Sequence, residues 1–498
     1  MTANGVVLAI DQGTTNTKAL LVDARGEILR QASTPNTVSY PQPGWAEQSA
    51  TALVEGVLAV IAEAAAGATE DIVAVAISNQ RESIVVWDAE TGEPIGPCII
   101  WQCRRSAPAC EKLRADGHGK TIERKTGLAL DPLFPAAKIA WLLDNVEGAR
   151  ERADAGRLRA GTVDSWLLWT LTGGKVHATD HSNASRTQLF DTAALRWDEE
   201  LARLFDVPLS LLPEIRPSNA EFGRIAASIG ALPPGIPIHA MIGDSHAALY
   251  GHGVRGPGTV KATYGTGTSL MALTRERVLS HHGISSTIAW STADGPAYAL
   301  EGNISVSGQA AAFMADMLGL EDAAALSALA RSVPDSNGVA FVPALVGLGA
   351  PHWRADARGL VTGLTLGTRP AHLARAALEA IAFQVADVFS AMEQDIGIPF
   401  AELRADGGAS RNGFLMQFQA DLIGRPVETA AAAEVSALGA AALAFSGLGQ
   451  EMQMAQAQHR FRPEIEDADR QSHLSRWRRA IAQTLTETAN GSTTGGHS

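Results

Sequence analysis

The chain has 498 residues, and its 40 lysine and arginine residues against 53 aspartate and glutamate residues give a net charge of −13. This length predicts more than one domain, and a composition of 46% hydrophobic and 19% charged residues is typical of globular proteins. The acidic balance argues against a nucleic-acid partner, since phosphates would repel the protein. No apolar run reaches ~18 residues and no basic stretch precedes the first one, so we expect no membrane segment, no signal peptide and a cytoplasmic location.

The first elements of the chain are two short apolar runs, residues 6–10 and 19–22. The first run is rich in β-branched residues, and the polar segment Asp11–Lys18 separates it from the second. This pattern predicts two buried strands that are joined by a tight turn.

The predicted turn combines residue types that bind phosphate. Gly13 would let the backbone approach a bulky anion. Thr14 and Thr15 would add hydroxyl donors, Lys18 would add a cation, and Asp11 at the strand end would hold Mg²⁺ through water. The alternative is an ordinary hairpin turn with local hydrogen bonds, because the P-loop pattern GxxxxGK[ST] is absent.

Helix and strand patterns then alternate along the N-terminal half. Residues 51–67 have apolar residues at helical spacing, and residues 72–78 form an apolar run typical of a buried strand. Helical patterns recur at 136–146 and 164–171, the second ending at a glycine stop. This alternation favours α/β layers.

Polar and aromatic residues that follow the strand at 72–78 are candidates for a substrate site. Arg81 and Glu82 would offer a donor fork and an acceptor pair to vicinal hydroxyl groups, and the alternative is a surface ion pair. Trp101 would give an apolar wall to a carbon chain, or it is a core tryptophan.

A second strand and turn of the same kind follow in the C-terminal half. The apolar run at 260–263 leads into the glycine and hydroxyl segment Tyr264–Ser269, and another apolar run follows at 270–273. Two such turns, one in each half, indicate a duplicated fold whose halves hold one nucleotide in the cleft between them. A third glycine cluster, at 406–412, would let a flat ring approach the backbone, or it is a simple strand-to-helix turn.

Asp244 is the candidate catalytic residue. It ends the strand predicted at 236–242, just before the second turn. A kinase that acts on an alcohol needs a group that accepts the hydroxyl proton, and a carboxylate at a strand end in the cleft suits that role. The alternative is a second carboxylate directed at Mg²⁺, and the two roles can overlap.

Ten motifs in chain order resemble those of the FGGY carbohydrate kinases, over about residues 6–450. The likeness is strongest to the members that act on glycerol. The motifs include AIDQGTTNTK (9–18), PGWAEQ (43–48), NQRE (79–82), IIWQCRR (99–105), KIAWLLDN (138–145), HSNASRT (181–187), GDSHAAL (243–249), YGTGTS (264–269) and DGGASRN (406–412).

The resemblance implies an α/β protein with a duplicated, two-domain, actin-like ATPase (ribonuclease H-like) fold and an ATP cleft between the domains. Its expected activity is ATP-dependent phosphorylation of a hydroxyl group on a small polyol or sugar, with Mg²⁺. We expect residues 1–250 to bind the polyol and the phosphates, residues 251–485 to bind ATP, and residues 486–498 to form a disordered tail. The resemblance also implies a homo-oligomer, a dimer or a tetramer.

Site residues follow from the resemblance by matched position. Asp244 would be the general base, and it would share Mg²⁺ with Asp11. The expected polyol ligands are Arg81, Glu82, Trp101, Asp244 and Ser245. The expected ATP ligands are Thr14, Thr15, Asn16, Lys18, Thr266, Gly308, Gly408 and Asn412.

Four positions depart from the members that act on glycerol. The chain has Leu133 where they usually have tyrosine, Ser245 where they have glutamine, Ser269 where they have an aromatic residue, and Cys103 where they have aspartate. Smaller side chains predict a larger pocket, so a tetritol or a pentose derivative stands beside glycerol as a substrate. The alternatives are a pentulose kinase and a non-catalytic nucleotide switch on the same fold.

Overall fold

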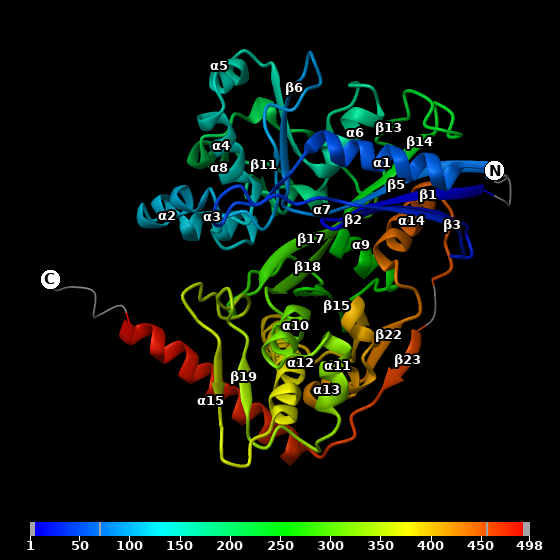
Figure 1. The fold of residues 1–498 in the computed structure, drawn as a ribbon. Coiled ribbons are helices and arrows are strands. Elements are labelled where there is room, and N and C mark those ends of the chain that lie inside the picture. The colour runs from blue at the N-terminus through cyan, green and yellow to red at the C-terminus, as the bar shows by residue number, and fades with distance from the viewer. Residues whose placement is uncertain (1–4, 69–70, 455–456, 492–498) are drawn as a thin grey trace.

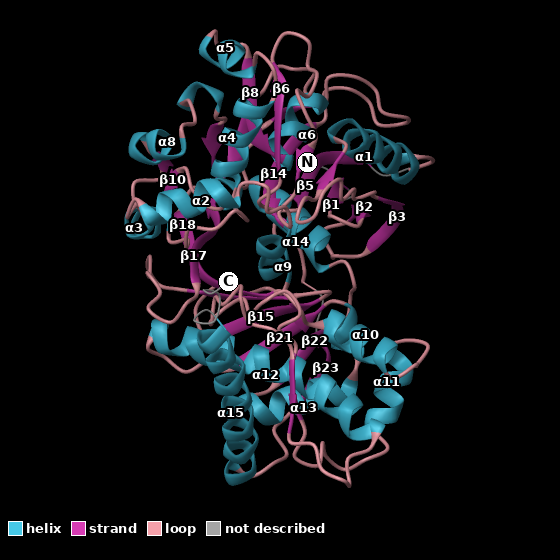
Figure 2. Ribbon diagram, turned by 60° about the vertical axis from the view of Figure 1, so that its left-hand side comes forward, coloured by secondary structure: helices cyan, strands magenta, loops and turns pink. Residues whose placement is uncertain are grey.

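The computed structural model describes residues 5–68, 71–454 and 457–491. The N-terminal half forms an upper lobe and most of the C-terminal half forms a lower lobe (Figure 1). Each lobe contains one large mixed β-sheet with helices packed against it (Figure 2), and the described residues also form smaller sheets of two to four strands. None of the helices in these described ranges is long and apolar enough to cross a membrane.

The upper sheet has three parallel strands at its centre. β1 runs parallel to β5 and β5 runs parallel to β14, whereas β2 pairs with β1 as the antiparallel arm of a hairpin. The apolar runs form these strands because both faces of the sheet are covered. In sheet order the strands are β13 (Gly223–Arg224), β14 (Pro237–Gly243), β5 (Asp71–Asn79), β1 (Gly5–Gln12), β2 (Asn16–Val22) and β3 (Ile28–Pro35).

The lower sheet repeats this arrangement. β15 and β16 form an antiparallel hairpin, and β15 runs parallel to β21, as β1 does to β5. The duplication predicted from the two glycine and hydroxyl turns is therefore present in the strand topology. In sheet order the strands are β17 (Ser285–Thr292), β18 (Gly295–Ile304), β16 (Thr268–Leu273), β15 (Thr259–Tyr264), β21 (Glu402–Asp406), β22 (Val427–Ala430) and β23 (Ala457–Phe461).

Helices and short strands complete the two lobes. The short strands are β4 (Glu47–Gln48), β6 (Ile84–Asp88), β7 (Cys98–Ile99), β8 (Leu158–Thr162), β9 (Ala178–Asp180), β10 (Phe190–Asp191), β11 (Arg196–Trp197), β12 (Glu214–Arg216), β19 (Ala340–Val342) and β20 (Leu360–Thr362). The helices are α1 (Ala50–Ala65), α2 (Ala107–Ala115), α3 (Gly119–Thr126), α4 (Pro135–Asn145), α5 (Ala149–Asp154), α6 (Val163–Leu171), α7 (His181–Ala184), α8 (Glu199–Phe205), α9 (Asp244–Gly251), α10 (Gly308–Met317), α11 (Ala323–Ala330), α12 (Pro370–Ile396), α13 (Gly413–Ile423), α14 (Val435–Gly447) and α15 (Asp467–Gly491).

Helices α9 and α14 join the lobes. α14 comes late in the chain, yet it packs against β1, β5 and β14 of the upper sheet and against α9 (Figures 1 and 2). The two helices touch through glycines, because a Cβ on Gly439 would lie 1.8 Å from the Ala247 carbonyl oxygen and one on Gly251 would lie 2.3 Å from the Val435 carbonyl oxygen. Side chains at these two positions would force the helices apart.

The C-terminal helix reaches into the segment that was predicted to be a tail. α15 continues to Gly491, whereas the sequence predicted a disordered tail from 486. The buried side chains of Trp477, Ile481 and Thr484 fix this helix against the lower lobe, so it extends beyond the low-complexity boundary. The rest of the predicted tail, 492–498, lies outside the described residues.

We expect the stability of the upper lobe to depend on the protonation of Asp164. This carboxyl is fully buried in α6, where burial and nearby Asp180 raise its pKa to about 7. The folded protein therefore favours the protonated form, whose stabilising contribution is complete below its ordinary pKa and is lost as the pH rises through about 7. Asp164→Asn should lack this loss.

The stability of Asp164→Asn relative to the parent should rise by about 3 kcal/mol at most between about pH 5 and pH 8. Urea unfolding of both proteins across this range measures the difference. A difference that stays constant with pH would contradict the prediction.

Candidate active site

Three strand ends of the upper sheet meet at one edge. Gln12 at the end of β1 pairs with Asn79 at the end of β5, and Asn79 pairs with Gly243 at the end of β14. Because these strands are parallel, the segments that follow them emerge side by side. This register brings together the first turn, the Arg81 segment and Asp244, which are far apart in the sequence.

Side-chain hydrogen bonds to its backbone carbonyls support the first turn, and the tip of the turn is exposed. Asn36 donates to the Gly13 carbonyl at 2.7 Å, and Gln48 donates to the Thr14 carbonyl at 2.9 Å. The Thr15 side chain remains exposed at the tip, as does that of Asn16. The turn can therefore present hydroxyl and amide groups to a ligand without rearranging its supports.

Two other predicted ligands near this turn already have partners. The Lys18 ammonium pairs with Glu434 at 2.7 Å, at the start of α14, so it is tied to the joint between the lobes. The Trp101 indole N–H donates to Thr14 Oγ1 at 2.9 Å, while the Trp101 side chain remains 37% exposed. Trp101 is therefore not a core tryptophan, and an apolar ring face stays available.

The second turn lies against the start of α10. Gly308 donates its N–H to the Gly265 carbonyl at 3.1 Å, and Ser307 donates to the Thr266 carbonyl at 2.9 Å. A Cβ on Gly308 would lie 2.5 Å from the Gly265 carbonyl oxygen, so only glycine allows this approach. Exposed Thr266 and half-buried Gly308 thus lie next to each other, as the predicted ATP site requires.

The third glycine cluster packs against the end of β15. Gly407 has a φ of +88°, and a Cβ there would lie 2.5 Å from the Tyr264 carbonyl oxygen. Gly408 is exposed with open space where a Cβ would point, which leaves its backbone accessible to a flat ring. Asn412 accepts from Leu415 N and donates to Ser327 Oγ, so its side chain also caps α13.

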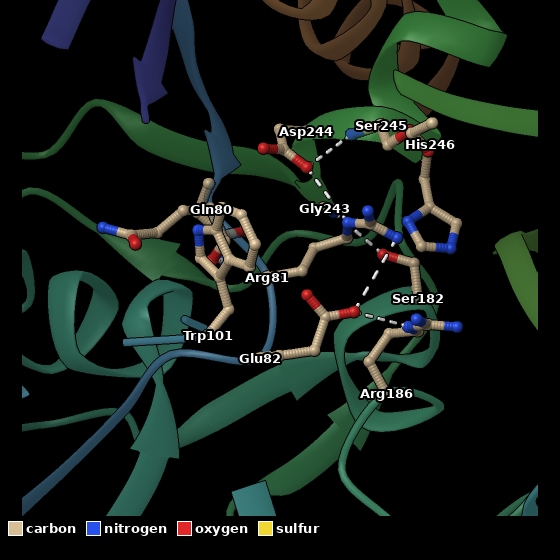
Figure 3. Close-up of polar contacts among 12 residues, drawn as sticks. Gln80, Arg81, Glu82, Trp101, Ser182, Arg186, Gly243, Asp244, Ser245 and His246 are labelled. Carbon is tan, nitrogen blue, oxygen red and sulfur yellow. Dashed lines mark hydrogen bonds and ion pairs between the residues drawn. The ribbon is translucent and has the colours of Figure 1, made fainter. Parts of the chain in front are cut away.

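Asp244 is the first residue of α9 and its carboxylate is partly open. Arg81 Nε donates to Asp244 Oδ1 at 3.0 Å, and the Ser245 N–H donates to the same oxygen at 2.6 Å (Figure 3). The side chain is 38% exposed, and Oδ2 accepts none of the hydrogen bonds found within the described chain. Burial raises the pKa of Asp244, and the Arg81 charge opposes that rise.

Behind Arg81 lies a buried cluster of four charges. Arg81 Nη1 pairs with Glu301 at 2.6 Å, Arg186 pairs with the other Glu301 oxygen at 2.9 Å, and Arg186 Nε donates to Glu82 at 2.6 Å. Arg186 and Glu301 have no exposed side-chain surface. Arg81 and Glu82 are thus not a surface ion pair.

Two residues of this cluster, and Lys138 beside it, had no predicted role. Arg186 lies within the HSNASRT motif, which was a usable signal. Glu301 is a lone acidic residue in the apolar strand β18, and Lys138 lies in KIAWLLDN. Lys138 is fully buried and donates to the Glu82 carbonyl at 2.8 Å, which supports the left-handed backbone of Glu82 at φ +58°.

Asp11 has the properties of a cation ligand. Ser78 Oγ donates to Asp11 Oδ1 at 2.8 Å, and burial, with the negative charges of Asp244 and Glu434, raises the pKa of Asp11 to about 7. A bound cation would remove this penalty. In the part of the chain that the structure describes, no three histidine, cysteine or acidic side chains form a complete metal site.

Three of the residues that differ from the glycerol-type motifs, Ser245, Ser269 and Cys103, have hydrogen-bond partners within the chain. Ser245 Oγ accepts from buried Lys261 Nζ at 2.8 Å and contacts Ser269 Oγ at 2.9 Å. Cys103 is buried and its sulfur accepts from Arg105 Nε. The Cys103 change therefore does not widen an open pocket.

The sequence matches one protein family over nearly its whole length. Residues 6–251 match the N-terminal domain of the FGGY family of carbohydrate kinases, and residues 260–448 match the C-terminal domain of that family. The chain belongs to the FGGY family of carbohydrate kinases. The predicted two-domain α/β fold of this family is confirmed.

Individual members of the family differ in how similar they are to this chain. The glycerol kinase of Symbiobacterium thermophilum is 47% identical over 490 residues, 96% of this chain and 98% of that protein. The crystal structure of Plasmodium falciparum glycerol kinase with ADP has a TM-score of 0.91 and 32% identity, covering 97% of this chain and 98% of that one. A xylulose kinase from Lactobacillus acidophilus, at 22% identity and a TM-score of 0.86 over 98% of this chain and 99% of that one, shares the fold.

This FGGY kinase is therefore an ATP-dependent phosphotransferase for a hydroxyl group of a small polyol or sugar. The predicted enzyme class is confirmed. Its non-catalytic alternative has lost support, because the chain matches glycerol kinases over nearly its full length.

The two neighbouring glycines of the third cluster should behave differently on substitution. Gly407→Ala forces a side chain onto the Tyr264 backbone at positive φ, so it should lower the melting temperature by several degrees. Gly408→Ala adds its methyl group in open space and should leave the melting temperature unchanged, while ADP affinity falls if the adenine ring packs there. Calorimetry of both variants with and without ADP measures the effects, and equal melting temperatures for the two variants would contradict the assignment.

Proposed function

We propose that this FGGY kinase transfers the terminal phosphoryl group of ATP to glycerol, with Asp244 as the general base. The observation that carries the proposal is the Arg81 to Asp244 contact, which directs one carboxylate oxygen at the arginine and leaves the other oxygen for a substrate hydroxyl. The relatives that are most similar over the full length support glycerol as the substrate.

The polyol site combines groups suited to a short chain of hydroxyls. Figure 3 shows Asp244, Arg81, Glu82 and Trp101 grouped together. One Glu82 oxygen is used by Arg186, so the other can accept from a hydroxyl, and the Trp101 ring can cover the carbon chain. Held in this way, a hydroxyl beside Asp244 loses its proton to the carboxylate as the phosphoryl group arrives.

The nucleotide would lie between the two turns. Thr14, Thr15 and Asn16 of the first turn and Thr266 of the second would donate to phosphate oxygens, and backbone N–H groups near Gly308 and Gly408 would face the nucleoside. Fixed donors of this kind stabilise the charge of the transferring group without reorganising water. Lys18, in contrast, pairs with Glu434, so its charge would act on Asp11 and on the joint between the lobes.

Asp11 and Asp244 are the residues that would hold Mg²⁺. Their carboxylates fit this ion because Mg²⁺ prefers oxygen ligands and is usually bound by one or two carboxylates together with substrate phosphates. Burial raises the pKa of both carboxyls, and a bound cation would oppose that rise. When bound, the ion would neutralise negative charge on the phosphates.

The remaining expectations from the sequence stay predictions. They are the domain boundaries at 250 and 485, a cytoplasmic location, and a dimer or tetramer.

Substrate identity is tested by measuring ADP release with glycerol, erythritol, threitol, xylitol, ribulose and xylulose. We expect glycerol to give the highest kcat/KM. A kcat/KM at least tenfold higher with a tetritol or a pentulose would overturn the glycerol assignment and would instead support the enlarged pocket or the pentulose kinase. If the rate of ATP consumption does not change when any of these substrates is added, the kinase mechanism itself is rejected.

The Asp244→Asn variant tests the base. Loss of general-base assistance should lower kcat by about 10²–10⁴-fold, while ATP still binds because the predicted contacts of the two turns with ATP are unchanged. Asp198→Asn is a matched control, since Asp198 also begins a helix next to a basic residue, Lys125, but lies outside the site. It should keep the parental kcat; near-parental turnover in Asp244→Asn would remove the base assignment.

A further inference from the structure

Glu301 joins the two lobes at the catalytic residues. It lies in β18 of the lower sheet, whereas both of its arginine partners, Arg81 and Arg186, come from the N-terminal half. Its two oxygens are divided between them, at 2.6 Å to Arg81 Nη1 and 2.9 Å to Arg186 Nη1. Although burial opposes ionisation, Arg186 and Arg81 hold the pKa of Glu301 below its ordinary value.

The geometry of the arginine carries this contact to Asp244. The guanidinium group is planar and rigid, so fixing one nitrogen fixes the direction of the others. Glu301 holds Arg81 Nη1, and Nε of the same group donates to Asp244 Oδ1 at 3.0 Å. Gly243 leaves room for this path, because a Cβ there would lie 2.6 Å from Arg81 Cδ.

A second set of contacts leads from Glu301 toward the second turn. Ser269 Oγ donates to Glu301 Oε1 at 3.1 Å and contacts Ser245 Oγ at 2.9 Å. Lys261 donates to the same Ser245 oxygen at 2.8 Å. Ser269 and Lys261 lie on β16 and β15, the strands that flank the turn at 265–267, so hydrogen bonds connect Glu301 to both of these strands.

We propose that Glu301 is a positioning residue, which holds Arg81 in the orientation that places the Asp244 carboxylate for phosphoryl transfer. Glu301 acts through Arg81 and does not touch the substrate. Because it comes from the lower sheet, the geometry of the base depends on how the two lobes pack together. This inference rests on the proposed role of Asp244.

The test replaces Glu301 and a matched glutamate elsewhere. Glu301→Gln removes the charge but keeps the shape, and we expect kcat to fall about 10–100-fold, the range that a misplacement of about 1 Å can produce, with the KM for ATP within about threefold. Glu379→Gln is the control: Glu379 is also buried and paired with two arginines, Arg375 and Arg476, but it lies on α12. It should keep the parental kcat.

A double-mutant cycle separates positioning from a merely structural role. If Glu301 acts through Arg81, adding Glu301→Gln to Arg81→Ala should lower kcat by less than a further twofold. If Glu301 has a merely structural role, the kcat losses of the two single variants should instead multiply in the double variant. Multiplying losses, or a parental kcat in folded Glu301→Gln, would overturn the inference.

Should Glu301→Gln not fold, Glu301→Asp takes its place. It keeps the buried negative charge but is one methylene too short to reach both arginines, so it should fold and still lose at least about tenfold in kcat. A parental kcat in folded Glu301→Asp would overturn the inference.

Asp244→Asn in the same assay tells the two proposals apart. If Asp244→Asn loses its activity while the Glu301 variants keep the parental kcat, only the positioning role of Glu301 is rejected. Parental activity of Asp244→Asn would reject the base and the inference together.

Discussion

The guanidinium of Arg81 is the group on which the arrangement of the site depends. It is almost fully buried, and a buried charge is tolerated only when partners surround it. Its partners come from three places: Asp244 from the start of α9, Glu82 from the same loop, and Glu301 from the lower sheet. The need to neutralise one cation therefore fixes the relative positions of three segments, two of them in different lobes.

The duplicated topology explains why the ligand groups lie between the lobes. Each sheet has a hairpin beside a parallel strand, and in each the hairpin turn faces the edge where the parallel strands end. A turn at such an edge has unpaired backbone N–H groups and little side-chain cover, which suits an anion. The α9 and α14 joint, with glycine contacts at 251 and 439, lets these two helices pack closely where the lobes meet.

The sequence predicted local features well, because short-range patterns determine them. The strands β1, β2 and β5 and the helices α1, α4 and α6 lie within a few residues of their predicted bounds. Partnerships over long sequence separations were not predictable. Lys18 is a residue type that often binds phosphate, but its partner in the structure, Glu434, is 416 residues away. Glu301 was not singled out in the sequence, and only the packing of β18 beside Arg81 and Arg186 gives it a role.

The electrostatics of Asp244 follow from two opposing effects. Burial raises the pKa of Asp244, and the neighbouring Arg81 charge opposes that rise. Arg81 is shared among three carboxylates, so its charge stabilises ionised Asp244 only in part. The negative charge of Glu82 also raises the pKa of Asp244 directly, whereas Glu301 pairs with another nitrogen of the same guanidinium, Arg81 Nη1. The cluster behind Asp244 therefore tunes the base as well as holding it, which accounts for four charges buried next to one partly open carboxylate.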